Sequence, residues 1–78
     1  MFGKRLRSAR LKRGFTQQSI ADKILISLRT YQKYEQGTRF PSYEVLIDLA
    51  DNLNVSIDWL LGRDDFLESL GVSFDEYL

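Results

Sequence analysis

Apolar residues recur three and four positions apart along residues 2–61, and short polar stretches containing glycine or proline separate the groups. This spacing places the apolar side chains on one face of a helix, whereas strands would alternate with a period of two. The pattern predicts an all-helical fold of five helices with short connections. The expected helices cover about residues 2–13, 17–24, 28–36, 43–54 and 57–61.

The predicted helix boundaries carry residues with suitable backbone chemistry. Side-chain oxygens able to accept from free amides at a helix start occur at Thr16, Ser27, Ser42 and Ser56. Glycines that can end the expected helices, by tolerating a left-handed conformation, follow at Gly14, Gly37 and Gly62. In the first helix we expect Leu6 and Ala9, together with Leu11, to face the core.

Residues 16–37 contain two of these helices, joined by about three residues. Two helices with so short a connection must cross steeply, and Ala21 is small where the second helix would approach the first. In the second helix, Tyr31 and Tyr34 share the inward face. The outward side chains are Leu28, Arg29, Gln32 and Lys33. The segment is therefore predicted to be a helix-turn-helix motif that presents residues 28–33 as a protruding ridge.

The formal net charge of zero hides a division between the two halves of the chain. Residues 1–40 hold ten Lys or Arg against two acids, a net charge of +8, and residues 41–78 hold one Arg against nine acids, a net charge of −8. Charge runs are often only solvated faces. Because the basic half coincides with the helix-turn-helix pattern, we favour an anionic partner such as nucleic acid.

Cysteine and histidine are both absent from the sequence. Disulfides and thiolate metal sites are therefore excluded, and the commonest general base and metal ligand is missing. The carboxylates are scattered rather than paired, so we expect neither an enzyme nor a cofactor or metal site. Apolar runs are short and the basic start has no apolar central region, which predicts a soluble cytoplasmic protein without membrane contact.

The composition changes after Gly62, so we divide the chain into a domain of residues 1–62 and an acidic amphipathic extension of residues 63–78. Apolar residues at helical spacing, including Phe66 and Leu70, predict a short helical extension. Ser73 and Glu76 form a capping-box pattern that would begin a further turn. The extension either completes the small core or contacts a second subunit or a protein partner, and disorder is the third alternative.

Taken together, residues 3–62 resemble the phage repressor and Cro-like helix-turn-helix family, of the xenobiotic-response-element type. The segments that carry this resemblance are Arg10, Ser27 and residues 14–17, 20–21, 34–37, 41–42, 46–49 and 54–62. The resemblance implies a lambda-repressor-like DNA-binding domain. It also implies a bacterial or phage-encoded regulator associated with the nucleoid.

The family resemblance implies roles for individual residues. The base-contacting positions would be Leu28, Arg29, Gln32 and Lys33, in which Arg or Lys suits guanine, Gln suits adenine and Leu can touch a thymine methyl. Positions on the phosphates or the groove margin would be Gln17, Ser27, Thr30 and Arg39. Arg10 and Glu35 match a buried ion pair that orients the second motif helix.

Two further positions matter for the interpretation. Ile57 and Trp59 either seal the core or contribute dimer contacts, and Phe66 and Leu70 are the other candidate dimer contacts. Leu25 occupies the turn position that the family usually fills with glycine. Its side chain disfavours a left-handed conformation by about 1 kcal/mol or more, so we expect the turn to be slightly re-formed.

The sequence is interpreted as a transcriptional regulator, a repressor that binds an inverted-repeat operator in double-stranded DNA as a homodimer through the major groove. One alternative is an antitoxin that binds a toxin through its C-terminal part and represses its own promoter. The other is a protein-interaction module that uses its acidic half and does not bind DNA. Absence of DNA binding at low salt would favour that module, because non-specific binding is strongest there.

Overall fold

A computed structural model describes residues 1–63, and all structural statements below concern that part of the chain. It contains five helices and no strand, which confirms the predicted all-helical fold. The helices are α1 (Phe2–Lys12), α2 (Gln17–Lys23), α3 (Leu28–Gln36), α4 (Tyr43–Leu53) and α5 (Ile57–Leu60). None of them is long and apolar enough to cross a membrane. The predicted helical extension lies outside the described residues, and the division at residue 62 stays a prediction.

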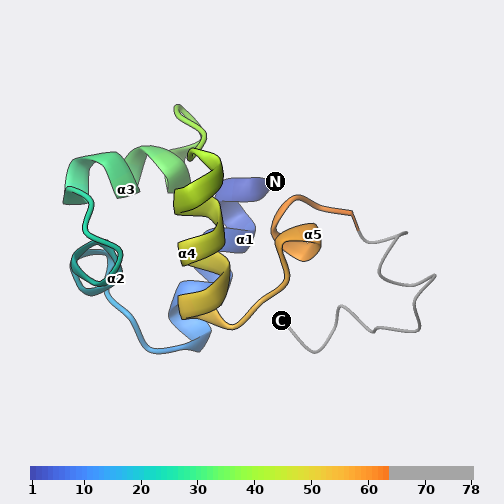
Figure 1. Ribbon diagram of the computed structural model, residues 1–78, viewed down its shortest axis with the longest axis horizontal. Helices are drawn as coiled ribbons and strands as arrows, with labels where there is room; N and C mark the ends of the chain where they lie inside the picture. Colours follow the sequence, from blue (N-terminus) through green and yellow to red (C-terminus); the bar gives the residue numbers. More distant parts are fainter. Residues whose placement is uncertain (64–78) are drawn as a thin grey trace.

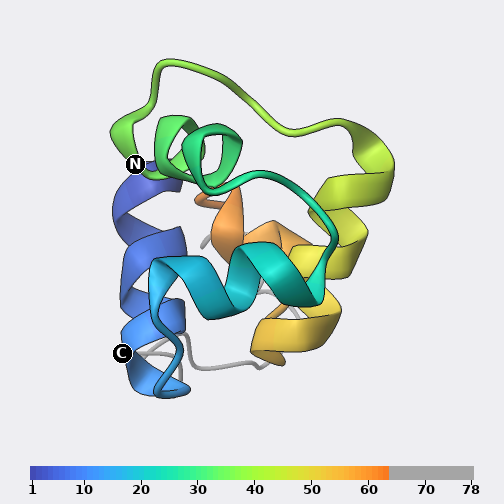
Figure 2. The same cartoon turned by 90° about the vertical axis from the view of Figure 1, so that its left-hand side faces the viewer.

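The helices surround one core, with the helix-turn-helix pair at one side. In Figure 1, α2 and α3 lie at the left and α5 lies at the right. Figure 2 looks onto the left-hand side and shows α2 crossing the front, with α1 and α4 on either side. Helix α3 packs on both α1 and α2, and α5 packs on α1 and α4. The pair α2 and α3 is therefore supported from behind by the other helices.

The core is formed by apolar side chains from every helix. Leu6 and Ala9 are buried as expected, but Leu11 is 54% exposed, so its predicted inward orientation is wrong. Leu11 lies next to Arg10, which is buried, and successive helical residues point in different directions, so Leu11 faces solvent. Trp59 has none of its surface exposed, which resolves its two alternatives in favour of the core. Ile57 is partly buried and packs against that core.

All five helices in residues 1–63 end in the same way. A residue with positive φ donates its N–H to the carbonyl three positions earlier, and the next residue donates to the carbonyl five positions earlier. These left-handed residues are Gly14, Leu25, Gly37, Asn54 and Gly62. The helices α1, α2, α4 and α5 each end one residue before the predicted boundary, because that boundary residue is the C-cap: Arg13, Ile24, Asn54 and Leu61.

Leu25 is the exception among these left-handed residues, since the others are glycine or asparagine. Its φ is 61°, so the turn keeps the left-handed conformation and the expected re-forming of the turn is wrong. Its N–H donates to the backbone carbonyl of Asp22 at 3.2 Å, and the N–H of Ile26 donates to the backbone carbonyl of Ala21 at 3.0 Å. Ile26 packs against the core, which holds the turn in place despite the strain at Leu25.

Replacing Leu25 by glycine is expected to stabilise the protein. The left-handed conformation costs leucine about 1–2 kcal/mol, and the greater backbone entropy of glycine offsets about 0.5–1 kcal/mol of that gain. Little burial is lost because Leu25 is 91% exposed. Thermal unfolding should show Tm raised by about 2–8 °C. Leu25→Ala keeps the strain and serves as the control, and equal Tm values for the two variants would contradict a backbone origin.

The start of α1 packs directly on the backbone of α3. A Cβ atom at Gly3 would lie 2.3 Å from the backbone oxygen of Glu35 and 3.0 Å from that of Tyr34. Only a residue without a side chain lets the two helices approach this closely. Sequence reasoning overlooked Gly3, although a glycine inside an expected helix can indicate close packing. This contact contributes to the position of α3 relative to the rest of the fold.

Candidate nucleic-acid interface

Hydroxyl side chains begin both helices of the motif. Thr16 accepts from the Ser19 amide at 3.0 Å, and the Ser19 hydroxyl accepts in return from the Thr16 amide at 2.8 Å. Ser27 accepts from the Thr30 amide at 3.1 Å, and its hydroxyl lies 2.8 Å from the Thr30 hydroxyl. These contacts satisfy amides that have no partner within the helix. They define where α2 and α3 start.

Helix α3 has a buried face and a solvent-facing one. Tyr31 and Tyr34 are buried, as the sequence pattern predicts. Arg29 is exposed to solvent, whereas Leu28, Gln32 and Lys33 are half-buried. The four candidate base-contacting side chains thus share the side of α3 opposite its tyrosines. That side forms a ridge with one exposed cation and three half-buried side chains.

An ion pair inside the fold joins α1 to α3. The Arg10 Nε donates to the Glu35 Oε2 at 2.7 Å, and its Nη2 lies 3.3 Å from Oε1. The two side chains are only 8% and 5% exposed. The Arg10 Nη1 also donates to the Phe15 carbonyl at 3.0 Å, in the connection between α1 and α2. One guanidinium group therefore ties together α1, the end of α3 and the approach to α2.

Glu35 is held ionised by its neighbours. Burial alone would raise its pKa, but hydrogen bonds from Arg10, Tyr31 and Gln17 outweigh burial and hold the pKa below its ordinary value. The hydrogen bond to Glu35 raises the pKa of Arg10, against the opposing effect of burial. Burial and the hydrogen bond to Glu35 raise the pKa of Tyr31, so its hydroxyl stays a donor. The site is a carboxylate that accepts from three different side chains.

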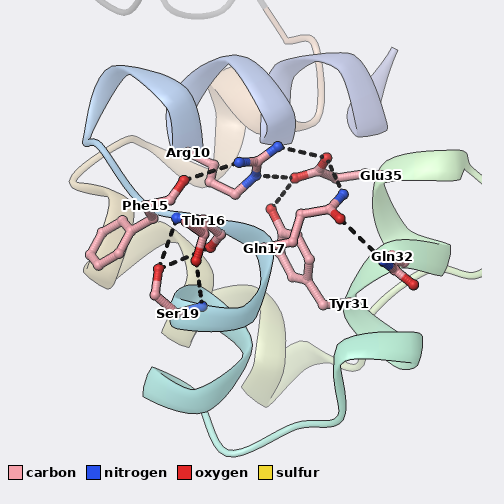
Figure 3. Close-up of polar contacts among 8 residues, drawn as sticks. All are labelled: Arg10, Phe15, Thr16, Gln17, Ser19, Tyr31, Gln32 and Glu35. Carbon is pink, nitrogen blue, oxygen red and sulfur yellow. Dashed lines mark hydrogen bonds and ion pairs between the residues drawn. The ribbon is translucent and has the colours of Figure 1, made fainter.

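Gln17 connects this buried carboxylate to the ridge, as Figure 3 shows. Its Nε2 donates to the Glu35 Oε1 at 3.1 Å. Its Oε1 accepts from the Gln32 Nε2 at 3.2 Å. The predicted phosphate-contacting residue and one of the predicted base-contacting residues are thus directly hydrogen-bonded to each other. Gln17 keeps a second amide hydrogen beyond the one given to Glu35.

A shallow hollow of about 600 Å³ lies between α1 and the start of α2. Arg7, Phe15 and Gln17 line it, together with Leu28 at the start of α3. Sequence reasoning did not include Arg7 among the site residues. The signal was present, because Arg7 lies one helical turn before Arg10 and therefore on a neighbouring part of the same face. The structure places this exposed cation beside two of the candidate contact residues.

Arg39 lies in the loop that follows α3, at the other end of the ridge. The next residue, Phe40, packs against Phe2 of α1, with ring centroids 4.8 Å apart and the rings tilted by 50°. Pro41 is buried, so the loop is held at two consecutive residues, Phe40 and Pro41. The exposed Arg39 is thereby presented from a loop attached to α1. Arg39, a predicted phosphate contact, is therefore carried by a loop that packs against the fold.

Several basic side chains of the N-terminal half have structural partners. Arg5 donates to the Trp59 carbonyl at 2.8 Å and lies over the indole ring at 5.1 Å. Arg13 donates to the Leu53 carbonyl at 2.9 Å, at the end of α4. With the buried Arg10, these residues connect α1 to other helices of the fold. Arg5 and Arg13 keep their charge, but some of their donors are engaged within the fold.

The other predicted contact residues lie in different parts of the molecule. Ser27 and Thr30 bond to each other at the start of α3, beside the ridge. The candidate dimer contacts Phe66 and Leu70 lie outside the described residues. No group of three or more His, Cys, Asp or Glu within residues 1–63 could hold a metal ion.

Comparison with known proteins shows which family and which regulators this chain is similar to. A family model described as a helix-turn-helix domain matches residues 3–65. The chain is 43% identical over 63 residues to the HTH-type transcriptional regulator ImmR of Bacillus subtilis, covering 81% of this chain and 50% of that regulator. It is 52% identical over 48 residues to the cryptic phage CTXphi transcriptional repressor RstR of Vibrio cholerae, covering 62% of this chain and 43% of the repressor.

A smaller relative is matched over most of its length. The uncharacterized HTH-type transcriptional regulator YazB of Bacillus subtilis is 38% identical over 60 residues, which cover 77% of this chain and 87% of YazB. The chain spans about half the length of ImmR and less of RstR. No solved structure is significantly similar to it. From the matched domain and the arrangement of α2 and α3, the chain belongs to the helix-turn-helix domain family.

Proposed function

We propose that this protein is a sequence-specific, double-stranded DNA-binding transcriptional regulator that acts as a repressor. The observation that carries the proposal is the ridge of α3, which turns Leu28, Arg29, Gln32 and Lys33 outward while Tyr31 and Tyr34 are buried behind it. The major groove of B-DNA admits one α-helix and exposes donors, acceptors and methyl groups on the base edges. The names of the relatives support the same function, since ImmR is a transcriptional regulator and RstR a transcriptional repressor.

Contacts with phosphates would come from residues at both ends of the ridge. Gln17 offers its second amide hydrogen at one end, and Arg39 offers a guanidinium at the other. Arg7 joins them as a cation beside Gln17, and Ser27 and Thr30 lie at the groove margin. Phosphate contacts fix register and orientation and carry no direct sequence information. In this proposal they position the ridge, and the ridge selects the bases.

The proposal includes a homodimer that binds an inverted repeat. One recognition helix contacts few base pairs, and two copies would read half-sites about 34 Å apart on one side of the duplex. The partly buried Ile57 on α5 is the dimer-contact candidate left within residues 1–63.

Selection of bound DNA from a random pool, followed by footprinting, tests the function and the dimer together. A palindromic site with half-sites one helical turn apart is expected, and selection of no sequence would overturn the proposal.

Arg29→Ala is expected to weaken binding to the selected site by about 1–3 kcal/mol and to relax the preference at one base pair. The reason is that an exposed arginine on the ridge can donate to two acceptors on guanine.

Arg39→Ala should weaken binding to all sequences alike and flatten the salt dependence by about one unit of slope, because it removes a phosphate contact. Binding titrations against selected and random DNA at several salt concentrations measure both effects. Equal loss of affinity for both DNAs in Arg29→Ala would contradict base contact by Arg29.

A further inference from the structure

The hydrogen bonds around Gln17 run in one direction, and the buried carboxylate determines that direction. An ionised carboxylate accepts hydrogen bonds and has none to donate. The end of the Gln17 amide that faces Glu35 at 3.1 Å must therefore be its NH₂ group. The other end, the oxygen, then faces Gln32 and can only accept.

The same constraint extends one step further, to the ridge. Since Gln17 presents an oxygen, Gln32 has to donate through its own NH₂ group, and the two atoms are 3.2 Å apart. The oxygen of Gln32 then lies on the side away from Gln17, as seen in Figure 3. An isolated glutamine amide can turn over and exchange its two ends. In this protein the amide of Gln32 is held in one of its two orientations.

We propose that Gln17 is a positioning residue that makes Gln32 specific for adenine. Gln32 presents to the groove an acceptor oxygen together with the second hydrogen of its NH₂ group. Adenine offers the matching donor and acceptor, its N6 amino group and N7. Guanine offers two acceptors at this edge and thymine one acceptor with a methyl group, so neither can donate to the oxygen of Gln32. Cytosine offers its N4 donor but no acceptor for the NH₂ group, so adenine alone matches both ends of the amide. The inference rests on the proposed function, because it concerns a base contact made by α3.

Three properties of the site favour a fixed orientation over a casual contact. Glu35 is 5% exposed in its side chain, so water does not compete freely for its oxygens. Arg10 and Tyr31 occupy it from other directions, which leaves Gln17 the approach from α2. Gln17 and Gln32 are themselves half-buried, which limits the other rotamers they can adopt.

The test replaces Gln17 by methionine, which has similar length and no amide. Selection of DNA by the wild-type protein should yield one position at which adenine is preferred by about tenfold or more over guanine. A Gln32→Ala selection identifies that position, because its preference is lost there. In Gln17→Met this preference should fall below about threefold while the other positions keep theirs. Loss of a phosphate contact would instead weaken binding to all sequences equally.

Gln18→Met is the matched control, since Gln18 is the neighbouring glutamine on α2 and its amide is bonded to Asp22 within the helix. It should leave the adenine preference unchanged. Glu35→Gln supplies a second variant, because a neutral amide can donate or accept and so frees the orientation of Gln17 and Gln32. Guanine should then become acceptable at the same position.

Spectra of the protein without DNA test the orientation of the Gln32 amide directly and show whether each variant is folded. In nuclear magnetic resonance spectra the Gln32 side-chain NH₂ protons should exchange more slowly with water in the wild type than in Gln17→Met. Failure of the wild type to select any sequence would overturn the proposed function. A selected site with an adenine preference that is identical in wild type and folded Gln17→Met would overturn only the positioning role.

Discussion

Arg10→Met is expected to destabilise the protein by about 3–5 kcal/mol, the largest effect among the substitutions considered. The variant leaves Glu35 buried without its guanidinium partner, and it also removes the hydrogen bond to the Phe15 carbonyl. Breaking one partner of a buried pair is costly because the remaining charge has lost both water and its counter-charge. Denaturant unfolding measures the change, and Tm should fall by more than about 12 °C.

Arg7→Met is the matched control, because it makes the same substitution one turn earlier on α1 at an exposed position. It should change the free energy of unfolding by less than about 0.5 kcal/mol. The double variant Arg10→Met/Glu35→Gln should recover part of the stability lost in Arg10→Met, since the uncompensated charge is gone. Additive effects of the two single substitutions would show instead that Arg10 and Glu35 are not coupled.

The same pair predicts a dependence on pH. Glu35 has a lower pKa in the folded than in the unfolded protein, so its ionised form favours folding. This contribution is complete above the unfolded pKa, about 4.3, and is lost as pH falls through the folded value. The difference in stability between wild type and Arg10→Met should therefore be largest near neutral pH and shrink in acid. A difference that stays constant from neutral to acidic pH would contradict the ion pair as its source.

The sequence predicted those parts of the fold that depend on local chemistry. Helix periodicity and caps such as Thr16 and Ser27 depend on neighbouring residues, so five helices could be expected from the pattern. Leu25 was misjudged because local strain alone suggested a re-formed turn, whereas the packing of Ile26 and two backbone hydrogen bonds stabilise the left-handed conformation. Tertiary contacts can outweigh a local preference of about 1 kcal/mol.

Most residues of the candidate site could be predicted from the sequence, whereas the hydrogen bonds between them could not. The outward positions of α3 follow from helical geometry once its buried face is known. The bonds from Gln17 to Glu35 and Gln32 join residues 15 or more positions apart, and no periodicity indicates them. Helical spacing places Arg7 near Arg10, but the proximity of Arg7 to Gln17 depends on how α1 crosses the start of α2.

These connections place a structural and a functional demand on the same residues. Glu35 stabilises the packing of α1 on α3 through Arg10 and, in our proposal, also orients the amide of Gln32 through Gln17. A substitution at Glu35 therefore changes stability and base preference together, whereas one at Gln17 should separate them. The position of α3 relative to α1 then becomes as important as the identity of the residues on its ridge.

Gly3→Ala tests that position directly and is expected to destabilise the protein by about 1–3 kcal/mol. The new methyl group would lie 2.3 Å from the Glu35 backbone oxygen, so α1 and the last turn of α3 have to move apart. Because the obstructing atom belongs to the backbone, a change of rotamer cannot relieve the contact. Alanine is otherwise the better helix former, so the measured loss understates the steric effect. Denaturant unfolding gives the stability change.

The same variant should lose affinity for the selected DNA by more than its unfolded fraction explains, since displacement of α3 shifts the whole ridge relative to Gln17 and Arg39. A change of one ångström in such a surface is enough to misalign hydrogen bonds to base edges, which require donor–acceptor distances of about 2.7–3.2 Å. Ser8→Ala, at an exposed position of α1, is the control and should alter neither stability nor binding appreciably. Wild-type affinity in folded Gly3→Ala would show that recognition tolerates movement of α3, and the contact at Gly3 would then matter for stability alone.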